Sequence, residues 1–365
     1  MVSKALVTGV YQRKAEEIAR LGVDLTVFTP PYWRDRRGDQ IAESLHTTGY
    51  RLVTLPTVGI GDYHLHNYPT LKRRLAQLRP QVLHMDEEPY NLATWAALRG
   101  AFDLGIASTF FTWQNINRNY PPPFPQMEAW VYRHTPEAIA GSSEAASVLR
   151  AKGYAGRIAE IPQFGVDPEL FSPDNHLPNT GTLRIGYAGA LLPEKGVDLL
   201  LRACALLQNA WQLTLLGEGE AQPALRELAS ELGIADRVCF EGRQESSGMP
   251  ACYRTLDLLV LPSRTTPTWK EQFGRVLTEA MASGVVVIGS DSGEIPNVIG
   301  DAGVVFPEED WQALAVSLQR LSDTPALREE LAAKGRQRVL ERYTMQAIAR
   351  DTVSLYRRLA APTAH

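Results

Sequence analysis

Short apolar runs alternate with helical patterns along the whole 365-residue chain, and this alternation limits the fold more than any other feature. Residues 81–84, 183–187 and 285–289 are strand candidates, and each contains branched apolar side chains. The segments between such runs, among them 90–102 and 197–208, repeat apolar residues at helical spacing. Strand–helix alternation favours parallel sheets covered by helices on both faces, so we predict an α/β fold.

The length of the chain predicts two domains, because single hydrophobic cores stop growing at about 250–300 residues. We expect two Rossmann-like domains, joined through the Pro- and Asn-rich segment 172–182. Ligands of open α/β sheets bind beyond the carboxyl ends of the strands. The sequence therefore predicts an active site in a cleft where two such domains face each other.

The segment 269–303 carries the strongest chemical signal. It places Glu271 and Glu279 eight positions apart, on either side of Gly274, and an apolar helix is predicted over 275–283. The first turn of a helix has free N–H groups and the positive end of the helix dipole, so it can hold a phosphate. Carboxylates on both sides of an anion site suit a diphosphate that has hydroxyl groups at each end. A nucleotide-sugar is such a ligand.

This pattern, with Phe273-Gly274 inside Glu-x7-Glu, resembles the signature of the retaining glycosyltransferases of family 4, the "group 1" transferases. Segments 138–154, 160–173 and 189–207 also resemble that family, and the resemblance covers about residues 80–345. It implies the GT-B fold, with a last helix that crosses back to the N-terminal domain. The expected domains are then 1–172 plus 345–365 on the acceptor side, and 182–344 on the nucleotide-sugar side.

The resemblance implies that Lys195 contacts the phosphates, that Glu279 binds the ribose and that Glu271 binds the donor sugar. Ala190 stands where the family usually has an arginine, so Arg264 or Lys270 is the candidate to replace it. The predicted donor-binding residues are Gly189, Lys195, Arg264, Lys270, Glu271, Phe273, Gly274, Arg275, Val276 and Glu279. Lys195 and Glu271 are also predicted to be catalytic.

The N-terminal half departs most from the family. A first strand is predicted over residues 4–8, and only Gly9 follows it. Phe111 stands where the family commonly has a histidine. The backbone carbonyl near Phe111 is nevertheless a candidate to stabilise oxocarbenium charge, so Phe111 is the third predicted catalytic residue. Acidic residues could activate an acceptor hydroxyl as a general base. The predicted acceptor-side residues are Gly9, Asp86, Glu87, Glu88, Thr112, Trp113, Gln114 and Asn115.

Composition adds expectations about cofactors and partners. The chain has no Asp-x-Asp and no metal-ligand spacing, so we expect no metal and no cofactor beyond the nucleotide-sugar donor. A net charge of −4 gives no reason to expect nucleic-acid binding. Three unpaired cysteines and no signal-peptide pattern favour a cytoplasmic protein. Basic and aromatic residues in 32–39, 70–80 and 118–134 fit either an ordinary solvated face or peripheral contact with the inner membrane face. A lipid-linked acceptor would require such contact.

The sequence leaves two alternatives to a metal-independent retaining hexosyltransferase. One is a sugar-nucleotide epimerase or phosphorylase on the same scaffold, and the other is a non-catalytic nucleotide-sugar binding protein. The loss of the family's arginine and histidine is the only support for a protein without activity. No motif in the sequence identifies the nucleotide base, the hexose, the acceptor, the linkage or the oligomeric state.

Overall fold

A computed structural model describes residues 1–35, 38–173 and 181–361, and the chain divides into two compact units. Unit 1 consists of Met1–Gly165 and Met345–His365, and unit 2 consists of Val166–Thr344. The division lies after Gly165 and not after residue 172, because the backbone N–H of Val166 donates to the Tyr343 carbonyl at 2.8 Å. Phe171 is also buried in the core of unit 2. Most of the predicted linker, 174–180, lies outside the described residues.

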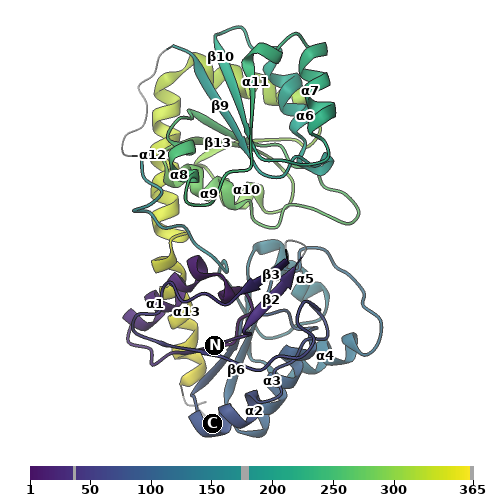
Figure 1. Ribbon diagram of the computed structural model, residues 1–365, viewed down its shortest axis with the longest axis vertical. Helices are drawn as coiled ribbons and strands as arrows, with labels where there is room; N and C mark the ends of the chain where they lie inside the picture. Colours follow the sequence, from purple (N-terminus) through teal and green to yellow (C-terminus); the bar gives the residue numbers. More distant parts are fainter. Residues whose placement is uncertain (36–37, 174–180, 362–365) are drawn as a thin grey trace. The chain divides into compact units, whose positions relative to one another are not determined.

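Unit 2 has a six-stranded parallel sheet in the order β11-β10-β9-β12-β13-β14. Figure 1 labels β9, β10 and β13 of this sheet. Strand β12, Leu258–Leu261, lies in the middle of the sheet, and all four of its side chains are buried. This is expected for a parallel sheet, because helices cover both of its faces. The order of strands reverses between β9 and β12, and ligands of such sheets bind at that switch point. The strands are β9 Leu183–Ala188, β10 Trp211–Leu216, β11 Val238–Gly242, β12 Leu258–Leu261, β13 Val286–Ser290 and β14 Gly303–Phe306.

The helices of unit 2 form two groups: α6 packs against α7 and α11, and α9 packs against α12. Their apolar faces join the strands in one core, as in the strand–helix alternation predicted above. The helices are η3 Pro193–Lys195, α6 Val197–Cys204, α7 Gln222–Glu231, η4 Ala235–Arg237, α8 Met249–Tyr253, α9 Arg275–Ala282, α10 Ile295–Ile299, α11 Trp311–Asp323 and α12 Pro325–Arg342.

The sheet of unit 1 has the same switch. Val2 forms parallel bridges to Phe28 in β1 and to Met85 in β5. Residues 1–3 therefore lie between the strand pair β1-β4 and the four strands β5-β6-β7-β8, and connect them into one sheet. The prediction of a strand over residues 4–8 is wrong. Residues 1–3 occupy that strand position instead, because Val2 already pairs with Phe28 and Met85 near the carboxyl ends of β1 and β5. The strands are β1 Thr26–Thr29, β2 Tyr32–Asp35, β3 Gly38–Ile41, β4 Arg51–Thr54, β5 Val82–Met85, β6 Ala107–Thr112, β7 Glu137–Ala140 and β8 Arg157–Glu160.

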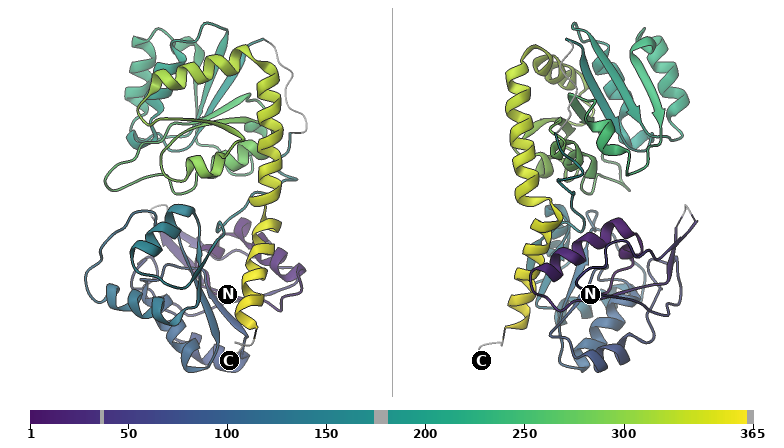
Figure 2. Two further views of the ribbon diagram at one scale, coloured as in Figure 1. Left: turned by 180° about the vertical axis from the view of Figure 1, so that it is seen from behind. Right: turned by 60° about the vertical axis from the view of Figure 1, so that its left-hand side comes forward.

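The last helix, α13, belongs to unit 1, where it packs against α1 as two views show (Figure 2). Its buried residues Ile348, Val353 and Leu355 share a core with Ile18 of α1, so the predicted return of the chain to the N-terminal domain is confirmed. The helices are η1 Ala5–Val7, η2 Gly9–Gln12, α1 Arg13–Arg20, α2 Leu71–Leu78, α3 Leu92–Asp103, α4 Phe124–His134, α5 Ser143–Ala151 and α13 Met345–Ala360.

Candidate functional site

The two segments that follow β9 and β12 lie against each other at the switch point of unit 2. A Cβ atom on Gly196 would lie only 2.0 Å from the Pro262 carbonyl oxygen, and the φ angle of Gly196 is +66°. Glycine meets both demands, because it has no Cβ and adopts positive φ without strain. The turn that carries Lys195 therefore packs directly against Pro262, in the segment that leads to Glu271.

The side chains of Lys195 and Glu271 meet in this site. The Lys195 ammonium lies 2.7 Å from Glu271 Oε2 and 4.3 Å from the centre of the Trp269 ring. The Ser263 hydroxyl donates to the same Glu271 oxygen at 3.2 Å. Both charged side chains keep some exposure, 18% for Lys195 and 12% for Glu271. The pair can therefore exchange its internal contact for contacts with a ligand.

The second carboxylate, Glu279, is held one turn into α9. Gly274, with φ +76°, lets the chain turn into this helix, which begins at Arg275. The Tyr253 hydroxyl donates to Glu279 Oε2 at 2.8 Å, and Arg275 Nε lies 3.1 Å from Glu279 Oε1. Burial raises the pKa of Glu279, although Arg275 and Tyr253 act in the opposite direction. The N-terminus of α9 thus lies beside a fixed carboxylate.

The structure gives Arg264 other partners than a phosphate. Its Nε donates to Glu309, Nη1 donates to the Pro193 carbonyl and to Asp198, and Nη2 donates to Asp198. These contacts use four of the five N–H groups of the guanidinium. Arg264 is therefore engaged within unit 2 in this structure. Lys270, half-buried beside Glu271, is the other predicted candidate for the arginine that Ala190 replaces.

The remaining predicted donor residues line the same region of unit 2. Gly189 directly follows β9, and the Tyr187 hydroxyl donates to the carbonyl of Ala190 at 2.8 Å. Phe273 packs edge-on against Tyr343, and Val276 packs on the core. Sequence reasoning missed the roles of Tyr253, Ser263 and Trp269. The only signal for Trp269 was its place two residues before Glu271, whereas Tyr253 is 26 residues from the carboxylate that it contacts.

In unit 1, Glu87 lies at the end of β5 and is fully enclosed by partners. Its carboxylate contacts His66 Nε2 at 2.5 Å, the Tyr68 hydroxyl at 2.8 Å and Lys4 Nζ at 2.9 Å. Burial raises the pKa of Glu87, but the charge of Lys4 and the contact with His66 outweigh it and hold the pKa well below its usual value. A carboxylate that is kept ionised and covered does not suit the general-base role predicted for it.

Asp86 is buried in the same way. It accepts a hydrogen bond from the Ser3 hydroxyl at 2.8 Å, and Lys14 Nζ lies 3.5 Å from its other oxygen. Glu88 differs from both neighbours, because it is only half-buried and burial raises its pKa. Its carboxylate accepts hydrogen bonds from the Thr112 hydroxyl at 2.5 Å and the Trp113 N–H at 2.8 Å. Of the three acidic candidates, Glu88 is the one that retains access to solvent.

The other candidates of unit 1 lie at the end of β6, directly after it, or at the start of η2. The Phe111 side chain is 2% exposed and packs in the core, and the N–H of Gly9 donates to the Glu43 carboxylate at 2.5 Å. Trp113 Nε1 donates to Gln163 at 2.9 Å. Gln114 and Asn115 are buried beside Thr112 and Trp113.

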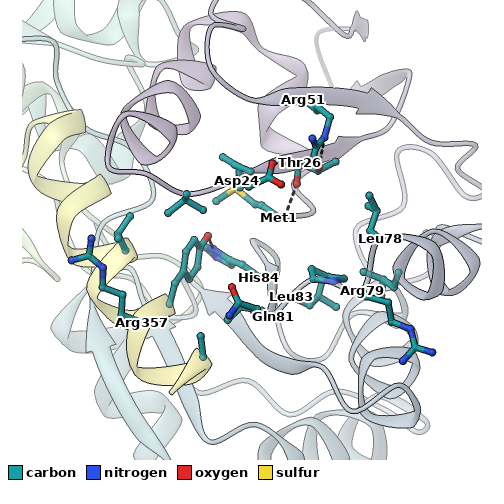
Figure 3. Close-up of a pocket in the computed structure, with 18 of the residues that line it drawn as sticks. Met1, Asp24, Thr26, Arg51, Leu78, Arg79, Gln81, Leu83, His84 and Arg357 are labelled. Carbon is teal, nitrogen blue, oxygen red and sulfur yellow. Dashed lines mark hydrogen bonds and ion pairs between the residues drawn. The ribbon is translucent and has the colours of Figure 1, made fainter. Parts of the chain in front are cut away.

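Unit 1 also has a cavity of about 420 Å³ that none of these residues lines (Figure 3). Gln81 and His84 of the β5 region, Thr26 of β1 and Arg51 of β4 contribute to its wall, together with Arg357 of α13. It lies toward the amino ends of these strands, whereas Asp86, Glu87 and Glu88 follow the carboxyl end of β5. The cavity is therefore separate from the predicted acceptor side.

The described ranges 1–35, 38–173 and 181–361 contain neither a metal-binding cluster nor a membrane-spanning helix. No group of three or more His, Cys, Asp or Glu side chains there could hold a metal ion. No helix of those residues is both long and apolar enough to cross a membrane.

Comparison with known proteins places both halves of the chain in one group. The family model "Glycosyl transferases group 1" matches residues 170–338, and the model "Glycosyltransferase Family 4" matches residues 10–170. The MMP alpha-(1->4)-mannosyltransferase of Mycolicibacterium hassiacum is 32% identical over 251 residues, 66% of this chain and 58% of that protein. A D-inositol 3-phosphate glycosyltransferase of Thermomonospora curvata is 35% identical over 46% of this chain and 44% of its own length. The chain thus spans about half the length of the curated relatives it matches.

Solved structures resemble the chain over nearly its whole length. A glycosyltransferase of Rickettsia africae has a TM-score of 0.76 at 16% identity, and 99% of this chain and 98% of that chain are covered. Anabaena HepE in complex with UDP has a TM-score of 0.72 at 18% identity, with 98% of each chain covered. At such identities the likeness shows the fold alone. Since the two family models together cover residues 10–338, the chain belongs to the group 1 glycosyltransferases and has their GT-B fold.

Proposed function

We propose that this protein transfers a hexose from a nucleoside-diphosphate sugar to an acceptor hydroxyl and retains the anomeric configuration. The observation that carries the proposal is the meeting of Lys195, Glu271 and the start of α9 at the switch point of unit 2. A cation, a helix N-terminus and two carboxylates lie there on segments that follow β9 and β12. This combination suits a diphosphate flanked by two groups that carry hydroxyls.

Each residue has a distinct part in the proposed reaction. The Lys195 ammonium and the N–H groups at the start of α9 stabilise the charge that grows on the leaving diphosphate. Glu279 accepts hydrogen bonds from the ribose hydroxyls, and Glu271 accepts them from the hexose. The departing phosphate oxygen assists deprotonation of the acceptor hydroxyl on the same face of the sugar, which keeps the configuration.

UDP-glucose is the donor to test first. The solved structures of Anabaena HepE contain UDP, UDP with glucose, and UDP-glucose. At a concentration of 100 times its dissociation constant, a ligand that binds only the folded state adds about 2.7 kcal/mol of stability. A thermal-shift screen over UDP-, GDP- and ADP-sugars would therefore rank the donors before any acceptor is known.

Incubation of the purified protein with labelled UDP-glucose then separates the classes of function. Release of glucose to water or to added acceptors, with the α configuration kept, supports the proposed transferase. Formation of an epimer would indicate the epimerase, and tight binding without any turnover would indicate the non-catalytic binding protein.

We propose further that the transfer needs no metal ion, because Lys195 and the α9 N–H groups supply positive charge at the diphosphate. Turnover should therefore be the same in excess EDTA and in buffer with magnesium. Loss of activity with EDTA and recovery with magnesium or manganese would contradict this part of the proposal.

We also propose a lipid-linked acceptor, which the protein reaches by peripheral contact of unit 1 with the membrane. Arg73 and Arg74 of α2 are exposed, whereas Lys72 is paired with Asp103 at 2.5 Å. Arg36 and Arg37 of the second basic segment lie outside the described residues. Co-sedimentation with anionic vesicles at low salt should be lost in the Arg73→Ser/Arg74→Ser variant. Absence of wild-type binding would favour an acceptor free in solution.

A further inference from the structure

The guanidinium of Arg264 joins three segments of unit 2. Its Nη1 and Nη2 atoms each lie 2.7 Å from an oxygen of Asp198, and Nη1 also lies 3.0 Å from the Pro193 carbonyl oxygen. Its Nε lies 2.6 Å from Glu309. The two contacts with Asp198 form a bidentate pair, which fixes both the direction and the distance of the partner.

These partners lie on both sides of Lys195. Pro193 begins the short turn η3, which ends at Lys195, and Asp198 lies in the first turn of α6. The backbone N–H of Arg264 also donates to the Glu194 carbonyl at 2.8 Å. Arg264 therefore contacts the backbone before Lys195 and the Asp198 side chain after it. No hydrogen bond or ion pair links its own side chain to the lysine in the described part of the chain.

The third partner, Glu309, has an unusual backbone. Its φ angle is +64°, which is uncommon for a residue other than glycine. Such conformations persist where the surroundings hold them. Next to it, both oxygens of Glu308 accept hydrogen bonds from Thr265, from the N–H and from the hydroxyl. The loop after β14 is thus bound to the segment that begins at Arg264, and this segment is bound to the Lys195 turn.

We propose that Arg264 is a positioning residue of the proposed transfer reaction, which fixes the Lys195 turn without touching the donor itself. The inference rests on the proposed function. A lysine ammonium stands on a flexible stem, so its reach toward a phosphate depends on where the backbone places that stem. A displacement of about 1 Å in a group that contacts the reacting centre can lower the rate about 100-fold.

The test compares Arg264→Met with Arg184→Met. Arg184 makes a similar bidentate pair with Asp257, and it lies in β9 at the far end of the strand from the Lys195 turn. Turnover of UDP-glucose and affinity for UDP would be measured in both variants. In Arg264→Met we expect kcat to fall about 10- to 100-fold while the Kd for UDP changes less. In Arg184→Met we expect a lower unfolding temperature and an unchanged kcat below it.

Two further measurements make the result specific. The effects of Arg264→Met and Lys195→Ala on kcat should be far from additive, because the first substitution acts through the second residue. Acetylation of Lys195, followed by mass spectrometry, should be faster in Arg264→Met than in wild type. This readout does not require that UDP-glucose be the donor. If Arg264→Met does not fold, Arg264→Lys replaces it, since lysine keeps the charge and loses the bidentate geometry.

The outcomes distinguish this inference from the proposed function. Absence of turnover in the wild type with every nucleotide-sugar would overturn the proposed function, and the acetylation rates would still test the inference. Equal acetylation of Lys195 in wild type and Arg264→Met would overturn the positioning role. So would equal losses of kcat in the Arg264 and Arg184 variants.

Discussion

Both units have a switch point in the strand order, but charged side chains near it are buried in unit 1 and partly exposed in unit 2. In unit 1, the carboxyl end of β5 leads to Asp86 and Glu87, which are buried and surrounded by Lys4, Lys14 and His66. In unit 2, the segments after β9 and β12 carry charged side chains that remain partly exposed.

The difference shows that sheet topology determines where a binding site can lie. The pairing of the side chains at that point determines whether they are available to a ligand. Glu87 has satisfied partners on both oxygens, so a ligand would have to break a buried network. Lys195 and Glu271 form a partly exposed pair, so a ligand can reach both charges. We therefore expect substitution of Glu87 in unit 1 to lower stability, and substitution of Lys195, Glu271 or Glu279 in unit 2 to lower activity.

The largest effect should come from Glu87→Ala. Removal of one partner from a buried ionic network leaves the others uncompensated, and this typically costs about 3–5 kcal/mol. Urea unfolding followed by fluorescence would measure the loss. Binding of UDP by the folded fraction should be preserved, and a variant as stable as wild type would break the contrast between the units.

Acid should affect unit 1 through the same residue. The folded protein lowers the pKa of Glu87, so the stabilisation is complete above the ordinary carboxyl pKa of about 4.3 and is lost as pH falls below it. Wild-type unfolding free energy should fall with decreasing pH in this window. The Glu87→Gln variant should show a weaker dependence, and equal slopes would contradict the role given to Lys4 and His66.

Lys195→Ala should lower kcat about 100- to 1,000-fold, the range seen when one group that stabilises transition-state charge is removed. Affinity for UDP should fall less, because the charge on the diphosphate increases as the sugar departs. Steady-state kinetics with UDP-glucose and calorimetry with UDP would separate the two effects. A change in KM alone would contradict the role of Lys195.

The two carboxylates of unit 2 should differ in the ligand that they affect. Hydrogen bonds to charged groups contribute about 1.5–3 kcal/mol, so each loss should weaken binding about 10- to 150-fold. Glu279→Ala should weaken both UDP and UDP-glucose, whereas Glu271→Ala should weaken mainly UDP-glucose. Calorimetry with both ligands tests this, and equal losses in both variants would be inconsistent with opposite ends of the donor.

The smallest effect should come from Tyr253→Phe, which removes the hydroxyl that donates to Glu279 at 2.8 Å. One such hydrogen bond contributes about 0.5–1.5 kcal/mol. Burial already raises the pKa of Glu279, and loss of the donor should raise it further. UDP affinity should therefore decrease at a higher pH in the variant than in wild type as the buffer is acidified. Identical pH profiles would mean that Tyr253 does not support Glu279.

Local sequence was a good guide to elements and a poor guide to pairing. The segment 269–303 predicted the helix α9, and the strand–helix alternation predicted the parallel sheets. Asp86 and Glu87 were predicted to be available as bases. Their partners Ser3 and Lys4 are 83 residues away in the chain, so no local pattern could show that both carboxylates are covered.

Periodicity, turn residues and motif spacing were sufficient for the fold class and the family, because these depend on residues close together in the chain. Tertiary structure alone decided that Arg264 holds Asp198, which is 66 residues away. It also decided that residues 1–3, and not 4–8, complete the sheet of unit 1. The physical reason is that a side chain's charge and accessibility depend on the neighbours that folding brings to it, and local spacing carries no record of them.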